Sequence, residues 1–230
     1  MEQLHNGFTL DASGSSFPLS TDSILLSHFV KLPRQANVLD LGSGCGTLGV
    51  LLCAKDASCR VTGVELDPQA HDAALQNIAR NGLQDRMKSI CADLRSFSEG
   101  IAPGQFQVCI SNPPYFSGGP ASTTHKVARR EDHCTTAELC SAASRALKYG
   151  GDFFVVHKPE KLAHLIACGA ACGMEAKRLL LVRHKENSEI SLILLSFRKG
   201  GKPGLIIDEA ALFDKDNNPT DFYQAVYHTI

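Results

Sequence analysis

The chain has 230 residues, enough for one large α/β domain with a small appendage. Its 23 basic and 24 acidic side chains give a formal net charge of −1, so any contact with nucleic acid has to use local basic patches. No stretch approaches the roughly 18 apolar residues of a membrane span. The first residues also lack the basic and apolar layout of a signal peptide. We therefore expect a cytoplasmic protein without membrane contact.

The nine cysteines are scattered and include no Cys-x-x-Cys pair. Cys109 lies inside an apolar run, where a thiol behaves as a small hydrophobic group. Cys168 and Cys172 are one helical turn apart, but no histidine or second cysteine pair completes a zinc set. The sequence therefore predicts free thiols in a reducing compartment and no metal site.

Short apolar runs alternate with helical patterns along most of the chain. A helix capped by Ser20 or Thr21 and ending at Val30 precedes the first core strand. Strands are then predicted at 37–41, 60–65, 88–91, 107–110 and 153–156, and helices at 48–55, 68–81 and 137–148. Thr135 and Glu138 can form a capping box before the last of these helices. Strands that alternate with helices indicate crossover units and a mostly parallel sheet.

The last third of the chain changes character. Residues 178–183 and 190–198 are strand-like runs separated by a polar turn at Asn187-Ser188, which predicts a hairpin at one edge of the sheet. The glycine-rich loop from Lys199 to Gly204 can be neither helix nor central strand. We divide the chain into an N-terminal segment with a cap helix (1–35), a core (36–198) and a C-terminal basic loop and tail packed on the core (199–230).

A glycine turn follows the first core strand, in the sequence Asp40-Leu41-Gly42-Ser43-Gly44-Cys45-Gly46. Ligands of open α/β sheets bind beyond the carboxyl ends of the strands, and glycine lets the backbone approach a ligand closely. Glu65 ends the next strand, where a carboxylate can accept hydrogen bonds from both hydroxyls of a ribose. Asp93, after the third strand, can accept from an adenine amino group or cap a helix.

Two nucleoside cofactors fit this turn. The stretch from Gly44 to Gly49 satisfies the G-x-G-x-x-G pattern of dinucleotide-binding proteins, which is weak by itself. Asp40 lies two residues before the first glycine of the turn. In S-adenosylmethionine sites, a carboxylate at that place lies near the positively charged methionine part of the donor. The acid therefore favours S-adenosylmethionine over a dinucleotide.

The run Asn112-Pro113-Pro114-Tyr115 follows the fourth strand, beside the same crevice. An exocyclic adenine amine is a poor nucleophile because its lone pair is delocalised into the ring. The Asn112 side-chain oxygen and the Pro113 carbonyl can each accept one N–H hydrogen bond, which favours the more tetrahedral nitrogen of the transition state. Tyr115 can stack on the base. In isolation the motif would be only a rigid turn, but its place after the glycine turn indicates methyl transfer to a planar nitrogen.

Together these motifs resemble class I amino-methyltransferases. More narrowly, they resemble bacterial tRNA (adenine-N6)-methyltransferases that modify the adenine on the 3′ side of the anticodon in a valine tRNA. The similar stretches are Ser20–Leu26, Val38–Gly46, Val64–Leu66, Ser111–Phe116, Ala128–Glu131 and Arg198–Gly204. The resemblance implies a Rossmann-like α/β fold whose seven-stranded sheet is mostly parallel, with an antiparallel last hairpin strand. It also implies S-adenosylmethionine as donor and S-adenosylhomocysteine as product, with Thr21 and Asp22 near the amino-acid part of the donor.

The expected site residues fall into three groups. The catalytic set is Asn112, Pro113, Pro114 and Tyr115. The donor is expected to contact Thr21, Asp22, Asp40, Gly42, Gly44, Gly46, Glu65, Leu66, Asp93, Leu94 and Asn112. The RNA substrate is expected to stack on Tyr115 and Phe116 and to place phosphates near Arg129, Arg130, Lys199 and Lys202.

Other functions use parts of the same pattern. The glutamine amide of translation release factors is also a planar, conjugated nitrogen. The enzymes that methylate it usually carry a long N-terminal helical domain, whereas about 35 residues precede the first core strand here. Adenines of ribosomal RNA or DNA are further acceptors. A dehydrogenase-like module would use Gly44 to Gly49 and would leave Asn112 to Tyr115 without a role. The sequence leaves the RNA species and the oligomeric state open.

Overall fold

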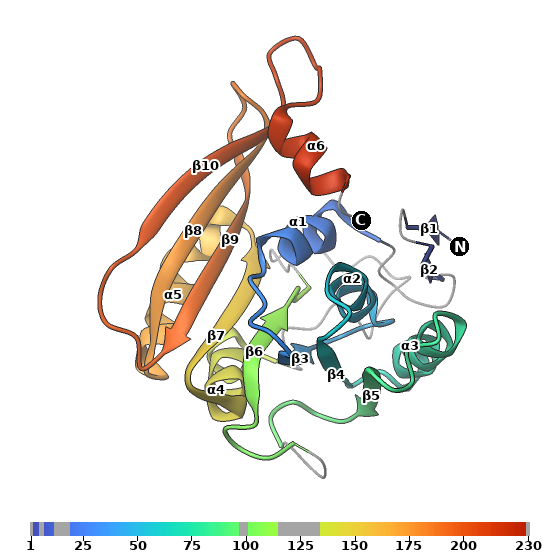
Figure 1. Ribbon diagram of the computed structural model, residues 1–230. Helices are drawn as coiled ribbons and strands as arrows, with labels where there is room; N and C mark the ends of the chain where they lie inside the picture. The colour runs from blue at the N-terminus through green and yellow to red at the C-terminus, as the bar shows by residue number, and fades with distance from the viewer. Residues whose placement is uncertain (1, 5–6, 12–18, 97–100, 115–133, 229–230) are drawn as a thin grey trace, which may run out of the picture.

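The computed structural model describes residues 2–4, 7–11, 19–96, 101–114 and 134–228. Its centre is an eight-stranded sheet with the strand order β10-β8-β9-β7-β6-β3-β4-β5 (Figure 1). The strand bounds in chain order are β3 Asn37–Leu41, β4 Arg60–Glu65, β5 Met87–Cys91, β6 Phe106–Ser111, β7 Leu147–His157, β8 Met174–Lys185, β9 Ile190–Lys199 and β10 Ile206–Phe213. Two short strands, β1 Glu2–Gln3 and β2 Thr9–Leu10, form a separate antiparallel pair.

The sheet is parallel over five neighbouring strands, β7, β6, β3, β4 and β5. β9 runs antiparallel between β7 and β8, and β10 runs parallel to β8. The C-terminal ends of the five parallel strands therefore meet at one edge of the sheet, which we call the carboxyl edge. We call the opposite edge the amino edge.

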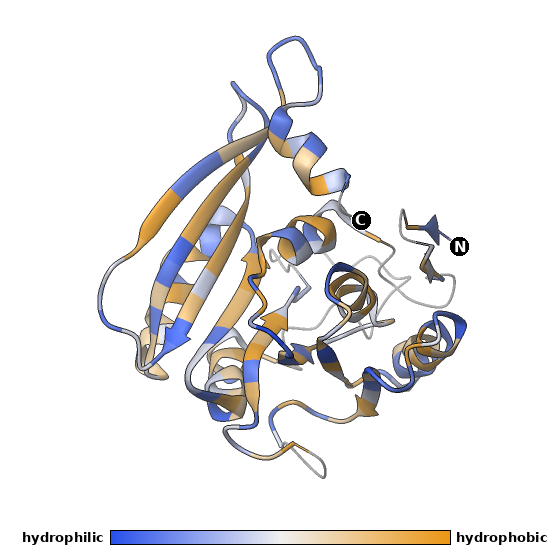
Figure 2. Cartoon of the chain, in the orientation of Figure 1, coloured by the Kyte–Doolittle hydropathy of each residue, from blue (hydrophilic) through white to orange (hydrophobic). Residues whose placement is uncertain are grey.

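Helices cover both faces of the sheet. Apolar side chains of α1 (Thr21–Phe29), α2 (Thr47–Lys55), α3 (Pro68–Arg80) and α6 (Asp221–Tyr227) belong to one hydrophobic cluster, and those of α4 (Thr136–Ala146) and α5 (Leu162–Ala171) belong to the other. A short 3₁₀ helix, η2 (Pro159–Lys161), precedes α5. Figure 2 shows hydrophilic and hydrophobic stripes side by side on α3 and α4, as expected for helices with one face on the sheet.

The apolar runs of the sequence become strands that are buried on both sides. In β6, Val108 and Ile110 face the cluster of α1, α2 and α3, whereas Phe106 and Cys109 face that of α4 and α5. Because both faces are covered, such strands carry nearly continuous apolar residues instead of an alternating pattern. The strands predicted at 37–41 and 60–65 are confirmed to the residue.

Local signals for the helix starts are also confirmed. Ser20 caps α1 by accepting a hydrogen bond from the backbone N–H of Ser23. Thr135 and Glu138 form the predicted capping box of α4. The predicted strand at 153–156 is too short, because β7 begins at Leu147, which pairs with Phe106 before a bulge in the ladder.

The expected strand count was wrong by one, since the main sheet has eight strands and not seven. The additional strand is β10, which pairs with β8 along the outer edge of the sheet. Its sequence begins with the exposed Ile206 and Ile207 and continues with Asp208 and Glu209, so it shows neither an alternating nor a buried pattern. Pairing with a neighbouring strand, which is a tertiary contact, makes this segment a strand.

Among the described residues, no helix is long and apolar enough to cross a membrane. All nine cysteines lie in the described part of the chain and are free thiols.

Candidate active site

The glycine turn, residues 42–46, connects the end of β3 to the start of α2 at the carboxyl edge. Gly42, Gly44 and Gly46 have φ angles of 71°, 55° and 83°, in the left-handed region that favours glycine. A Cβ on Gly46 would lie only 2.9 Å from the Cε atom of Met87. The turn therefore requires glycine for its conformation, and it places bare backbone where a ligand of an α/β sheet binds.

Most N–H groups of the turn already donate hydrogen bonds to other groups of the protein. Gly42 and Ser43 both donate to the carbonyl of Val64, at 2.9 and 3.0 Å. Gly44 donates to Oε2 of Glu65 at 2.8 Å. A dinucleotide-binding turn instead presents its N–H groups to a pyrophosphate. The hydrogen bonding of the turn therefore argues against the dinucleotide hypothesis.

Glu65 ends β4 as a half-buried, fixed carboxylate. Oε1 accepts from the backbone N–H of Asp67 at 2.9 Å, and Oε2 accepts from that of Gly44 at 2.8 Å. Each carboxylate oxygen can accept a further hydrogen bond. The geometry thus suits two neighbouring hydroxyls of a ribose, and the adjacent Leu66, which is 43% exposed, offers an apolar surface beside it.

Asp40 lies in β3 between Gly63 of β4 and Ile110 of β6. It is completely buried, and within the described part of the chain neither carboxylate oxygen has a hydrogen-bond partner. The buried hydroxyl of Ser43 in the glycine turn is also unpartnered there. Burial raises the pKa of Asp40 to about 8, and the charge of Glu65 adds to the rise. A buried carboxyl without partners is costly, so this one indicates a ligand that brings positive charge.

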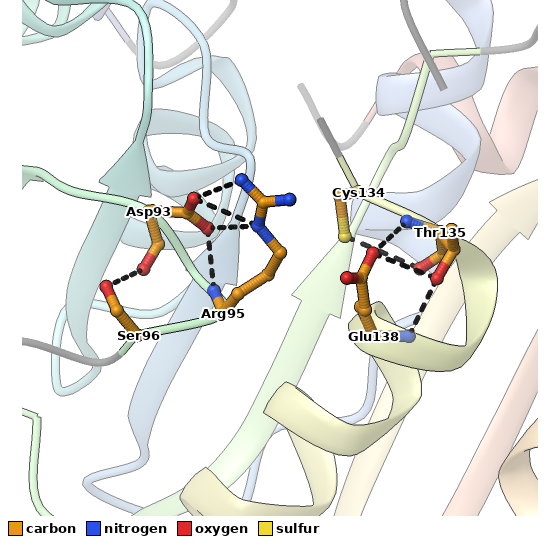
Figure 3. Close-up of polar contacts among 6 residues, drawn as sticks. All are labelled: Asp93, Arg95, Ser96, Cys134, Thr135 and Glu138. Carbon is orange, nitrogen blue, oxygen red and sulfur yellow. Dashed lines mark hydrogen bonds and ion pairs between the residues drawn. The ribbon is translucent and has the colours of Figure 1, made fainter. Parts of the chain in front are cut away.

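Asp93 follows β5 and is already engaged by Arg95 (Figure 3). Its carboxylate accepts from the backbone N–H of Arg95 at 2.8 Å and from its Nε at 2.9 Å. Figure 3 shows this pair opposite the start of α4, where Thr135 and Glu138 form the capping box. An adenine amino group bound at Asp93 would therefore share the carboxylate with Arg95, a neighbour that the sequence analysis did not consider.

Asn112 follows β6 at the carboxyl edge, next to the glycine turn. The end of β6 is tied to β3 because the buried hydroxyl of Ser111 donates to the carbonyl of Leu41 at 2.8 Å. Nδ2 of Asn112 donates to Oγ of Ser23 in α1 at 3.0 Å. Since the amide nitrogen is directed at α1, the side-chain oxygen faces away from Ser23. The contact thus holds the carboxamide in one of its two orientations.

Ser23 is the site residue that sequence reasoning missed. It lies inside the Ser20–Leu26 stretch, is 6% exposed, and accepts a hydrogen bond from the hydroxyl of Ser20. It is separated from Asn112 by 89 positions, so no spacing rule connects the two. Only the packing of α1 across the end of β6 brings them together.

The other predicted donor contacts lie at the start of α1 and after β5. Thr21 and Asp22 open α1 next to Ser23, and the hydroxyls of Thr21 and Tyr227 are 3.4 Å apart. Leu94 follows Asp93 and is partly buried. Four predicted substrate or catalytic residues lie outside the described part of the chain, namely Tyr115, Phe116, Arg129 and Arg130.

The structure does not bring Lys199 and Lys202 to the carboxyl edge. Lys199 ends β9, which is antiparallel to β7, so it lies at the amino edge. Its Nζ donates to the carbonyls of Ser144 and Leu147 at the end of α4, at 2.7 and 2.9 Å. Lys202 follows in the next loop, where its carbonyl accepts from Nζ of Lys177. The Lys199 amine therefore acts as a C-terminal cap of α4.

We expect Lys199→Met to lower the free energy of unfolding by about 1–2 kcal/mol, because two helix-end carbonyls lose a charged donor. Urea denaturation measures the change. Lys202→Met is the matched control and should change stability by less than about 0.5 kcal/mol, as for an ordinary surface position. Unchanged stability of Lys199→Met together with weaker RNA binding would contradict the capping role.

Within the described residues no group of three or more His, Cys, Asp or Glu side chains could hold a metal ion. The carboxyl edge instead combines a glycine turn, a carboxylate at the end of the next strand, a buried carboxyl in need of a cation, and an oriented asparagine followed by two prolines. These features suit a cationic nucleoside donor and an amine acceptor.

Comparisons with known proteins agree with this description. The family model described as methyltransferase small domain matches residues 20–167. Curated relatives from Photobacterium profundum and from a Shewanella species (strain MR-4) are both named tRNA1(Val) (adenine(37)-N6)-methyltransferase. They are 27% and 30% identical over 82% and 84% of this chain, and over 80% and 82% of their own lengths. A solved structure of a predicted O-methyltransferase from Agrobacterium tumefaciens matches with a TM-score of 0.71 and 19% identity, over 91% of this chain and 96% of that one.

The fold and the site together define a Rossmann-like, S-adenosylmethionine-dependent methyltransferase that acts on nitrogen. The chain belongs to the methyltransferase small domain family. The dinucleotide alternative is thereby excluded. The donor fits the residues present, because the Asp40 carboxyl and the Ser43 hydroxyl, which have no hydrogen-bond partner among the described residues, lie just before and in the glycine turn, and Glu65 keeps acceptor capacity beside it.

Proposed function

We propose that this enzyme methylates the exocyclic N6 amine of an adenine in tRNA, the adenine on the 3′ side of the anticodon in a valine tRNA. The proposal rests mainly on the Asn112 carboxamide, which Ser23 orients at the carboxyl edge beside the glycine turn. The relatives that match most of this chain are named for this reaction. Because tRNA is the substrate, we infer that the protein acts in the cytoplasm.

We assign the donor to the glycine turn and its neighbours. When bound, S-adenosylmethionine supplies an electrophilic methyl group on a sulfonium. Glu65 accepts hydrogen bonds from the ribose hydroxyls, and Asp93 accepts from the adenine amino group. Leu66 and Leu94 pack against the nucleoside. Gly42, Gly44 and Gly46 allow the close backbone approach.

The methionine part of the donor, with its sulfonium and ammonium charges, belongs, in this proposal, near three residues. Asp40 would complement its charge, which the lack of a hydrogen-bond partner for the carboxyl among the described residues supports. Thr21 and Asp22 at the start of α1 would contact it as well. The donor leaves the site as S-adenosylhomocysteine.

The acceptor amine is held by two oxygens on one stiff loop. The side-chain oxygen of Asn112 and the carbonyl of Pro113 each accept one N–H of the adenine amine, which favours pyramidalisation of its nitrogen. Pro114 limits the conformations of the loop. No strong base is required, since the nitrogen loses its proton readily once it carries the methyl group. Tyr115 fixes the face of the base by stacking.

The remaining substrate contacts concern the rest of the RNA. We assign Phe116 to the stacking surface and Arg129 and Arg130 to phosphates near the reacting adenine. Lys199 and Lys202 lie at the amino edge, so they can meet only a distant part of the RNA.

We expect Ser23→Ala to lower kcat about tenfold, because the carboxamide of Asn112 loses the hydrogen bond that selects its orientation. The affinity for S-adenosylmethionine should change less than twofold, as measured by calorimetry. Ser27→Ala is the matched control, since Ser27 is equally buried one turn along α1 but donates to the carbonyl of Ile24. Equal losses of kcat in both variants would show that Ser23 serves only helix stability.

The proposed function is tested by incubating the protein with donor labelled in the methyl group and either bulk tRNA or a translation release factor. We expect label that ribonuclease releases and protease does not. Nucleoside mass spectrometry should then identify N6-methyladenosine, and the same modification should disappear from valine tRNA of cells that lack the protein. Label that only protease releases would instead establish the glutamine-methylating alternative, and transfer only to ribosomal RNA or DNA would refute the tRNA assignment.

A further inference from the structure

The N-terminal segment Thr9–Asp11 is bound by two asparagines, Asn77 in α3 and Asn81 at its C-terminal cap. Oδ1 of Asn81 accepts from the N–H of Thr9 at 2.7 Å, and Nδ2 of Asn81 donates to the carbonyl of Thr9 at 2.8 Å. One helical turn earlier, Asn77 accepts from the N–H of Asp11 at 2.9 Å and donates to its carbonyl at 3.0 Å. Residues i and i+2 of an extended chain present their N–H and C=O groups to the same side. The two carboxamides therefore hold the segment as a neighbouring strand would.

Asn77 makes two contacts that Asn81 does not make. Its Nδ2 also donates to the carbonyl of Cys45 in the glycine turn, at 3.0 Å. Oδ1 accepts a second hydrogen bond from Nη1 of Arg80 at 3.2 Å, and Arg80 in turn forms an ion pair with Asp11. Both amide hydrogens and both oxygen lone pairs of Asn77 are thus used, in a side chain that is completely buried. A fully satisfied buried amide holds its partners rigidly.

We propose that Asn77 is a positioning residue that couples the N-terminal segment Thr9–Asp11 to the donor-binding glycine turn. The peptide after Cys45 is held in its orientation by Asn77, and the same carboxamide makes two of its other hydrogen bonds to the backbone of Asp11. Binding of the donor to the turn then stabilises the docked segment, and by linkage the docked segment strengthens donor binding by the same factor. The inference rests on the donor site alone and not on the identity of the acceptor.

Two variants distinguish coupling of the segment to the glycine turn from simple attachment of the segment to α3. Asn77→Ala and Asn81→Ala each remove two hydrogen bonds to the segment Thr9–Asp11. Only Asn77→Ala also removes the hydrogen bond to the carbonyl of Cys45. We expect Asn77→Ala to raise the dissociation constant of S-adenosylhomocysteine about tenfold, consistent with loss of a buried hydrogen bond. KM for the methyl donor should rise in parallel, while kcat at saturating donor should stay within twofold. Asn81→Ala should leave the dissociation constant within twofold of the wild type.

Hydrogen exchange in the unmodified protein provides a second test that needs no variant to fold. Saturation with S-adenosylhomocysteine should slow exchange of the Thr9 and Asp11 amide hydrogens at least about threefold, as expected for a segment that opens locally in the absence of ligand. Unchanged exchange on adding S-adenosylhomocysteine would overturn the proposal. Equal dissociation constants of S-adenosylhomocysteine for Asn77→Ala and Asn81→Ala would also overturn it, whether or not both are higher than that of the wild type. Neither the dissociation constants nor the hydrogen-exchange rates require RNA, so failure of the tRNA assay leaves these two tests intact.

Discussion

The Asn112→Ala enzyme should bind S-adenosylmethionine within about twofold of the wild type and turn over about 10²–10³ times more slowly, the range found when a preorganised polar group at a reaction centre is removed. The loss is large because the side-chain oxygen is one of only two acceptors assigned to the amine hydrogens in the transition state. Donor affinity should change little because Asn112, although counted among the expected donor contacts, lies on the loop after β6 and outside the glycine turn. Single-turnover experiments measure the rate of methyl transfer, and calorimetry measures the affinity for S-adenosylmethionine.

Asn112→Asp is the matched control for this prediction. A carboxylate keeps an oxygen for the amine hydrogens but cannot donate to Ser23 as the carboxamide does. We therefore expect a rate between those of the wild type and Asn112→Ala. A near-normal rate of Asn112→Ala would remove this side chain from the mechanism, as would a loss of donor affinity large enough to explain the lower rate.

At high pH, Asp40→Asn should raise the stability of the protein and lower its affinity for the donor. Burial raises the pKa of Asp40 from 3.8 to about 8, with the charge of Glu65 as the second cause. Below pH 4 the group is protonated in both the folded and the unfolded chain. Between pH 4 and 8 the unfolded chain releases the proton and the folded chain keeps it. The stabilisation present at low pH is therefore lost as pH rises towards 8.

An asparagine at position 40 cannot ionise, so the variant should lack this pH dependence. Urea denaturation between pH 6 and 9 should show a flatter profile than the wild type, which carries a slope of up to about 1.4 kcal/mol per pH unit from this group. Above pH 8 the variant should be the more stable protein. Parallel profiles for the two proteins would show that Asp40 is not the buried group that titrates.

Donor binding should respond in the opposite direction. A cationic donor favours the ionised carboxyl, so the wild type should release a proton on binding and bind more tightly as pH rises towards 8. Asp40→Asn should bind S-adenosylmethionine at least about tenfold more weakly at pH 8, with no proton release, because about 1.4 kcal/mol of charge attraction corresponds to that factor. Calorimetry in buffers of different ionisation enthalpy measures both effects. Equal proton release by the two proteins would refute the role of Asp40.

The local features of the fold could be predicted because they depend on neighbouring residues. The glycines of residues 42–46 require left-handed φ angles, and Thr135 with Glu138 closes a capping box within one helical turn. Glu65 could be placed at the end of a strand because the apolar run before it stops there. β10 could not be predicted, because its exposed residues become a strand only through pairing with β8.

The amino-acid sequence by itself therefore determined the class of fold, the glycine turn, the acid that follows it and the Asn-Pro-Pro loop, since each is written in residues close together along the chain. Only the tertiary structure decided which groups meet across the chain. It brought Ser23 into contact with Asn112, 89 positions away, and it placed Asn77 between Asp11 and Cys45. It also placed Lys199 at the amino edge, where it caps α4. The physical reason is that hydrogen-bond partners of buried side chains are chosen by packing, which no local pattern encodes.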